Sequence, residues 1–142
     1  MNINLELTDV DLASDRSAIF NPLLRYNESK VGDPSLIPLN ILITGDKDDT
    51  PLGGLWACTA YGWLSIELLY IPEQLRLGGI GKSILDTAES EATLRGCHSA
   101  RVDTHEFQGA LGFYKKCGYN VYGELPDYPT GHTRYFLKKG IQ

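Results

Sequence analysis

The sequence has no long apolar run, and this absence narrows the class of protein. Its 142 residues include no uninterrupted apolar stretch near the about 20 residues that a membrane-spanning helix requires. Met1 to Leu12 is polar and acidic, whereas a secretory signal starts basic and continues apolar. We therefore expect a cytoplasmic protein that does not bind membranes.

Cysteine is scarce as well. Cys58, Cys97 and Cys117 form an odd number without paired spacing, and no pair of Cys or His residues has the spacing of zinc ligands. The sequence therefore predicts reduced thiols, no disulfide framework and no metal. The acidic cluster from Gly45 to Thr50 is interpreted as the tip of a hairpin rather than as a metal site.

Basic residues are too few for a nucleic-acid-binding protein. Lys and Arg number 13 against 18 Asp and Glu, which gives a formal net charge of -5. A protein that binds a phosphate backbone normally presents a basic face, so nucleic acid is not expected as a partner. The acidic balance weakly favours cationic small molecules. Length and composition predict a single domain over residues 1–142.

The hydrophobic pattern predicts strands alternating with helices. A helix with Ala18, Ile19, Leu23 and Leu24 on one side would be capped by Asp11 or Ser14 and followed by a loop or broken helix over 27–38. Further helices are expected over 80–95 and 108–117. Strands are expected over 3–7, 39–44, 52–60, 63–71, 100–104, 119–122 and 133–137. The strand over 63–71 is the most apolar, which predicts a central strand that is buried on both faces.

A glycine-rich turn, Arg76-Leu77-Gly78-Gly79-Ile80-Gly81-Lys82, leads from that strand into a helix. Unpaired N–H groups and the positive end of the helix dipole favour an anion at such a turn, most simply a phosphate or pyrophosphate. A nucleotide-triphosphate loop requires glycine where Arg76 stands, and a dinucleotide fingerprint requires glycine where Ile84 stands. The pattern that fits is Arg or Gln, two residues, Gly, one residue, and Gly or Ala.

A second motif, Phe113-Tyr114-Lys115-Lys116-Cys117-Gly118-Tyr119, follows after a predicted helix and strand. With both motifs, the sequence resembles the GNAT superfamily of acyl-CoA-dependent N-acetyltransferases over nearly its whole length. The resemblance implies an α/β fold of the α+β type. Its central mixed, twisted sheet would have six to seven strands, about four flanking helices and a splay between the fourth and fifth strands.

The resemblance also implies a site for acetyl-CoA as co-substrate. Its pyrophosphate would bind the turn formed by Arg76, Leu77, Gly78, Gly79, Ile80, Gly81 and Lys82, and its pantetheine arm would pair with Leu69, Tyr70 and Ile71. A backbone N–H at about Ile71 would face the thioester oxygen. Many members have an Asn at the place of Phe107, seven residues before Tyr114, and here Gln108 is the substitute candidate.

Acetyl transfer to an amine requires a base and a proton source, because an alkyl ammonium has a pKa near ~10.4. The matching tyrosine of the family lies near the coenzyme sulfur, so Tyr114 is the candidate general acid, although a core role is also open. Glu67, a carboxylate in an apolar strand, is the candidate base, with Asp103 and His105 as rivals. His132, Arg134, Asp127 and Tyr128 are candidates for selecting the acceptor.

These observations predict an N-acetyltransferase that moves an acetyl group directly from acetyl-CoA to a primary amine, on a small molecule. Two alternatives stay open. One is an acetyltransferase for protein lysines or N-termini, and the other is an acyl-CoA-binding module without catalysis. The resemblance also allows a homodimer.

Overall fold

The computed structural model describes residues 1–47 and 49–142. The chain divides into two compact units, Met1–Pro34 and Ser35–Gln142, and each is described by itself. Within the described ranges, no helix combines the length and the apolar character needed to cross a membrane. The prediction of a single domain stays a prediction.

The first unit contains helix α1 (Ala13–Val31), with Pro22 in its interior. The predicted strand over 3–7 is wrong, because residues 1–12 form neither helix nor strand and no other strand within residues 1–34 could complete its hydrogen bonds. The predicted caps are also wrong, since α1 begins after Leu12 and has no side-chain cap. The helix extends to Val31, where Gly32 ends it with a φ of 82°.

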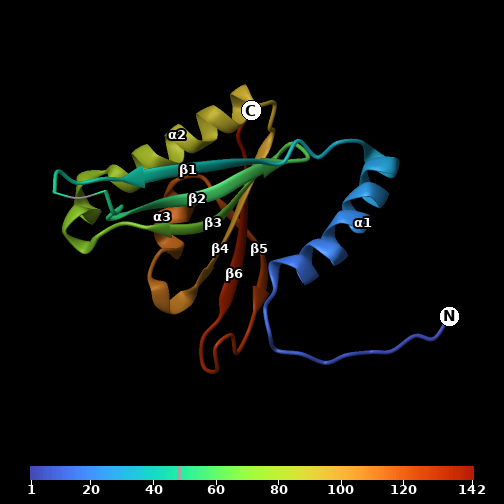
Figure 1. Ribbon diagram of the computed structural model, residues 1–142. Helices are drawn as coiled ribbons and strands as arrows, with labels where there is room; N and C mark the ends of the chain where they lie inside the picture. The colour runs from blue at the N-terminus through green and yellow to red at the C-terminus, as the bar shows by residue number, and fades with distance from the viewer. Residues whose placement is uncertain (48) are drawn as a thin grey trace. The chain divides into compact units, whose positions relative to one another are not determined.

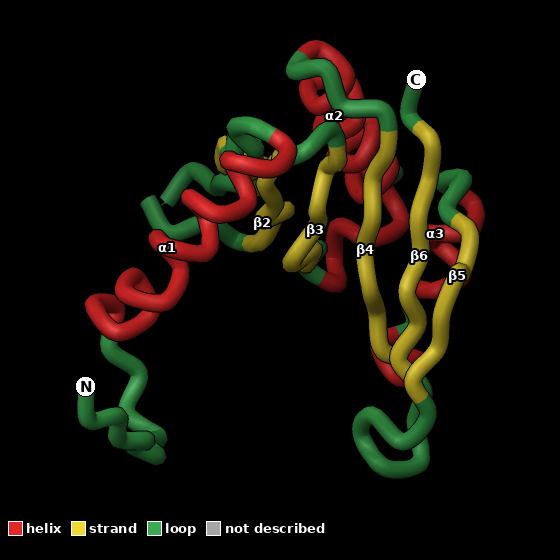
Figure 2. The backbone as a smooth tube through the Cα atoms, turned by 90° about the vertical axis from the view of Figure 1, so that its right-hand side faces the viewer, coloured by secondary structure: helices red, strands yellow, loops and turns green. Residues whose placement is uncertain are grey.

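The second unit is built on a six-stranded sheet in the order β1-β2-β3-β4-β6-β5. Strands β3 and β4 are parallel, and every other neighbouring pair is antiparallel. Figure 2 shows β4, β6 and β5 side by side. The strands are β1 (Ile37–Ile43), β2 (Gly53–Ala60), β3 (Trp63–Tyr70), β4 (Ser99–His105), β5 (Asn120–Leu125) and β6 (Arg134–Gly140).

The predicted antiparallel pairing of the first two of these strands is confirmed. Asp48, in the hairpin tip predicted between them, lies outside the described residues.

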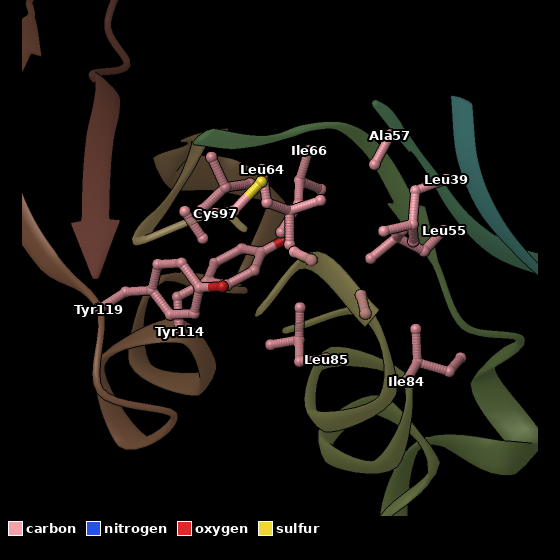
Figure 3. Packing of buried hydrophobic residues seen from close by; sticks show 14 of the residues in the cluster. Leu39, Leu55, Ala57, Leu64, Ile66, Ile84, Leu85, Cys97, Tyr114 and Tyr119 are labelled. Atoms are coloured by element: carbon pink, nitrogen blue, oxygen red, sulfur yellow. The ribbon is translucent and has the colours of Figure 1, made fainter. Parts of the chain in front are cut away.

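Helix α2 (Ile80–Leu94) supplies one side of the hydrophobic core. Its buried residues recur with the helical period, and the structure confirms the predicted apolar face of this helix. Figure 3 shows Leu85 of α2 in one core cluster with Leu64 and Ile66 of β3 and with Cys97, Tyr114 and Tyr119. The helix ends before Gly96, whose φ of 89° suits a glycine after a helix.

The segments that flank α2 differ from the prediction in detail. The 3₁₀ helix η1 (Glu73–Gly78) stands between β3 and α2, so the strand does not lead directly into the glycine turn. The single helix predicted over 108–117 is divided into the 3₁₀ helix η2 (Glu106–Gln108) and α3 (Leu111–Lys116). Gly109, with a φ of 73°, separates them because that backbone conformation cannot continue a right-handed helix.

The sheet opens between β3 and β4. Only Trp63–Ser65 of β3 pair with β4, and beyond this point the two strands diverge (Figure 1). The strands β3 and β4 are those predicted as the fourth and fifth, so the predicted splay is confirmed. Their numbers are lower by one because the predicted first strand, over 3–7, does not form. Its opening leaves backbone groups of both strands without a neighbouring strand on the facing edges.

A β-bulge marks the open part of β3. Trp56 pairs with Leu68 and Ala57 pairs with Ile66, so Glu67 is the extra residue of the bulge. The prediction that this strand is buried on both faces is wrong, because Glu67, Leu68 and Tyr70 are exposed. Side chains of β3 alternate until the bulge, and Leu64 and Ile66 are the two that the core buries.

Candidate functional site

The opening between β3 and β4 forms a cleft with a volume of about 990 Å³. This volume lies near the upper end for small-molecule sites, as a long ligand would require. Residues from β3, the N-terminal end of α2, β4, η2 and α3 contribute to its walls. The cleft is lined by Glu67, Leu68, Leu69, Tyr70, Ile71, Arg76, Gly79, Gly81, Lys82, Val102, Asp103, Thr104, Phe107, Gln108, Gly109, Ala110, Phe113, Tyr114, Lys116 and Cys117.

One end of the cleft is the N-terminus of α2. The Ser83 N–H is the first to bond within this helix, to the Gly79 carbonyl at 3.1 Å. The N–H groups of Ile80, Gly81 and Lys82 therefore precede the first helical hydrogen bond, at the positive end of the helix dipole. Gly79 has a φ of 79°, which explains why glycine stands there. This end of the cleft is suited to an anion.

Two cationic side chains flank this helix end. Arg76 donates from Nε to the Ile71 carbonyl at 2.8 Å, which leaves the other guanidinium N–H groups available. Lys82 donates to Asp86 at 2.6 Å, and that hydrogen bond raises the pKa of the Lys82 ammonium group. Both side chains are therefore cations at neutral pH beside the unpaired N–H groups.

Gly81 serves the packing of two helices. A Cβ at this position would lie 3.0 Å from the ring of Phe113, so a side chain here would require the Phe113 ring to shift. The two motifs noted in the sequence thus meet in space at this contact. The contact with Phe113 therefore favours glycine at position 81.

Tyr114 is buried, with 4% of its surface exposed, and it lines the cleft from α3. Burial, followed by the charge of Asp103, raises the pKa of its hydroxyl to about 12. Among the described residues, none forms a hydrogen bond with this hydroxyl. Tyr114 therefore presents a protonated, uncommitted donor at neutral pH.

Glu67 lies at the same cleft on the bulge of β3, where its carboxylate is exposed. Its predicted rival Asp103 also lines the cleft, but its Oδ1 accepts two hydrogen bonds from Arg134. The other rival, His105, does not line the cleft, and its Nδ1 contacts the Tyr128 carbonyl at 2.8 Å. Glu67 is the more available carboxylate of the two in the cleft.

Gln108 is held by hydrogen bonds at the end of β4. Its Oε1 accepts from the His105 N–H at 2.8 Å and from the Thr104 hydroxyl at 3.0 Å. Because both bonds use the amide oxygen, the amide NH₂ remains as the donor on the side chain. This arrangement suits the role of a fixed donor at the cleft.

Most of the predicted site residues gather in the cleft, and a few do not. Leu77 is fully exposed, and neither Leu77, Gly78 nor Ile80 lines the cleft. Leu69, Tyr70, Ile71, Arg76, Gly79, Gly81, Lys82, Gln108, Tyr114 and Glu67 do.

Sequence reasoning left out Val102, Thr104, Lys116 and several other wall residues. The signal for Phe113 and Cys117 was the helical stripe that they share with Tyr114. Val102 and Thr104 are brought to the cleft by the divergence of the strands, which the family resemblance implied but which no pattern within β4 itself indicates.

The loop between β5 and β6 lies against the end of β4 and against η2. Its Tyr128 contacts His105, and its His132 contacts Glu106 and Phe107. Arg134 stacks over Tyr128 while it bonds to Asp103. His98 lies elsewhere, against Trp63 and Ser99. Within the described ranges, no group of three or more His, Cys, Asp or Glu side chains could hold a metal ion.

Comparison with known proteins places these observations in context. The model of the acetyltransferase (GNAT) family matches residues 12–119. Acetyltransferase Atu2258 of Agrobacterium fabrum is 39% identical over 137 residues, which cover 96% of this chain and 98% of that protein. A blasticidin-S acetyltransferase of Streptomyces morookaense is 38% identical over 90 residues, 63% of this chain and 65% of that protein.

Two solved structures have the same fold. A crystal structure described as an acetyltransferase from Agrobacterium tumefaciens has a TM-score of 0.90 and 37% identity, and covers 97% of this chain and 99% of its own. One described as a streptothricin acetyltransferase from Bacillus anthracis, in complex with acetyl coenzyme A, has a TM-score of 0.58 and 17% identity. The match covers 65% of this chain and 57% of the Bacillus anthracis chain, and a likeness at this identity shows the fold alone.

Proposed function

The chain belongs to the GNAT acetyltransferase family, and from this premise we propose that it transfers an acetyl group from acetyl-CoA to a primary amine of a small molecule. The observation that carries the proposal is the cleft between β3 and β4. An anion-binding helix end, an unpaired strand edge and a protonated tyrosine all line this one cleft. The name of the Streptomyces morookaense relative supports a small-molecule acceptor.

The pyrophosphate of acetyl-CoA fits the N-terminal end of α2. The N–H groups of Gly81 and Lys82, which precede the first hydrogen bond of the helix, supply donors, and Arg76 and Lys82 supply positive charge. Leu69, Tyr70 and Ile71 offer the unpaired edge of β3 to the amide groups of the pantetheine arm, as an added strand would use it. Gln108 offers its NH₂ group from the opposite wall.

Acetyl-CoA supplies the activated acetyl group as a thioester. A backbone N–H near Ile71, on the open edge of β3, would stabilise the negative charge that develops on the thioester oxygen. Holding donor and acceptor in one cleft removes most of the entropic cost of their encounter, and direct transfer in a ternary complex follows from this arrangement.

Tyr114 acts on the departing sulfur chiefly as a hydrogen-bond donor. The pKa of its hydroxyl is about 12, whereas an alkyl thiol has a pKa near ~8.5. Full transfer of the tyrosine proton to the thiolate would therefore be unfavourable by about 5 kcal/mol. A hydrogen bond to the thiolate stabilises it without this cost, so Tyr114 remains protonated through the cycle. CoA leaves as the thiolate, which takes its proton from solvent water.

Glu67 takes the role of base, either directly or through one water molecule. The acceptor enters as an ammonium ion, and the exposed carboxylate of Glu67 attracts it to the cleft before accepting its proton. The bulge turns Glu67 out of the regular alternation of β3, so the strand retains its pairing with β2 while it presents this carboxylate.

Acetyl-CoA binding and CoA release test the proposal separately. Acetyl-CoA at about 100 times its dissociation constant should stabilise the protein by about 3 kcal/mol, and ATP should not. A panel of polyamines, aminoglycosides, amino acids, aryl amines and lysine peptides, assayed for CoA release, should give turnover with small amines. Turnover confined to peptides would instead support a protein acetyltransferase. Acetyl-CoA binding without any turnover would support a binding module.

A further inference from the structure

Aromatic and imidazole rings cluster around η2, the 3₁₀ helix whose Phe107 and Gln108 line the cleft. The ring of Phe107 stacks on that of His105, with centroids 5.1 Å apart and planes 21° apart. His132 meets Phe107 edge-on at 5.2 Å. Phe107 nevertheless keeps 52% of its surface exposed, and it lines the cleft. A large apolar ring thus remains open to a ligand while its neighbours fix its orientation.

The neighbours of Phe107 are themselves held in place. The Nδ1 atom of His105 contacts the Tyr128 carbonyl at 2.8 Å, and His132 lies 3.3 Å from a carboxylate oxygen of Glu106. Since a carbonyl oxygen only accepts, His105 carries its proton on Nδ1 in this contact. Both imidazoles are therefore fixed by polar contacts outside the ring cluster.

The backbone beneath the cluster is equally constrained. The Glu106 N–H donates to the Thr133 carbonyl at 2.8 Å, which joins η2 to the end of the loop between β5 and β6. Arg134 bonds to Asp103 and stacks over Tyr128 at 4.8 Å. The exposed ring is consequently a preorganised surface, and preorganisation reduces the entropy lost when a ligand binds.

We propose that this surface selects acceptors whose amine is carried by an aromatic or heteroaromatic ring, which packs on Phe107 while the ammonium group faces Glu67. The inference rests on the proposed function, which places the acceptor in this cleft. A contact between two aromatic rings is stronger than a contact between an aromatic ring and a saturated group of the same apolar area. The difference is about 2-fold to 10-fold in the binding constant. An aliphatic amine of the same size gains the apolar contact but lacks this preference.

The test compares two amines that differ only in the ring, 2-phenylethylamine and 2-cyclohexylethylamine. In the unaltered protein, kcat/KM should be about 2-fold to 10-fold higher for the phenyl compound. Phe107→Leu should bring the ratio to about one, because leucine retains apolar area without a π face. The matched control is Tyr122→Leu. Tyr122 is equally exposed, at 53%, but lies on β5 outside the cleft lining, so its loss should leave the ratio unchanged.

A second readout keeps the inference separate from the proposed function. Binding of each amine to the protein saturated with CoA is measured by calorimetry, with the same two variants. Tighter binding of the phenyl compound that disappears in Phe107→Leu supports the inference even if no amine is acetylated. Equal kcat/KM for both amines overturns the inference and leaves the proposed function standing. The inference is also overturned if Phe107→Leu raises the KM for acetyl-CoA and lowers kcat/KM for both amines by the same factor.

Discussion

Tyr114 illustrates how the surroundings of one side chain decide its chemistry. A phenol in water has a pKa near ~10, and burial in α3 raises it to about 12. The sequence motif predicts the residue, but the core role and the catalytic role could not be separated from the motif. The structure places Tyr114 in the lining of the cleft, and among the described residues its hydroxyl has no hydrogen-bonding partner. We therefore infer that Tyr114 serves both the core, through its ring, and the reaction, through its hydroxyl.

Replacing Tyr114 by Phe tests this dual role. The ring remains, so we expect the free energy of unfolding at neutral pH to change by less than about 1 kcal/mol. The hydrogen bond to the charged departing sulfur is lost, so kcat should fall by roughly 10-fold to 100-fold. The measurements are steady-state kinetics and acetyl-CoA affinity, which should be nearly unaltered. Unaltered kcat would remove Tyr114 from the mechanism and leave it as a core residue.

At the scale of single elements, β3 departs furthest from its predicted form. An apolar run of this kind predicts a strand that is buried on both faces. In the structure, β3 has a bulge at Glu67 and pairs with β4 only as far as Ser65, and its second half is exposed. Both features depend on neighbouring strands. The sequence of β3 alone could not indicate them, although the charged residue in the apolar run was a clue.

Replacing Glu67 by Gln tests the role that the bulge gives to this residue. Glutamine has the same shape, so β3 and the affinity for acetyl-CoA should be retained. As general base catalysis typically contributes about 100-fold or more, we expect kcat/KM for the amine to fall by at least this order. If kcat/KM for the amine is unaltered in the variant, the base is another group, with Asp103, His105 or water as the candidates.

At the scale of the whole molecule, the titration of buried acidic groups predicts how stability depends on pH. Burial raises the pKa of Tyr114 and Tyr119, and also that of the Cys97 and Cys117 thiols. Each group keeps its proton longer in the folded state than in the unfolded chain. The unfolded chain therefore releases protons first as pH rises, and stability is lost above about pH 9.

Urea unfolding at pH 8 to 11 measures this loss. Tyr114, with a pKa near 10 when unfolded and about 12 when folded, should alone remove about 1 kcal/mol between pH 9 and pH 11. The variant Tyr114→Phe should show a dependence that is shallower by this amount. A free energy of unfolding that stays constant from pH 9 to pH 11 in the unaltered protein would contradict the assignment of these buried groups.

The sequence by itself determined the family, most of the strands along the chain and the glycine turn that begins α2. Glycine spacing and the Phe113-Tyr114 motif are local patterns, and local patterns are set by backbone geometry that a few neighbouring residues dictate. The same is true of the apolar face of α2, which follows from the helical period. These features could be read before any tertiary contact was known.

Only the tertiary structure decided how the walls of the cleft are assembled and which groups are free to act. The strand predicted over 3–7 failed because a strand requires a partner. Asp103 is occupied by Arg134, which lies 31 positions later in the chain, and Phe107 is oriented by His105 and His132. Contacts between distant residues form only when the chain is folded, so no local pattern could distinguish the free carboxylate from the paired one.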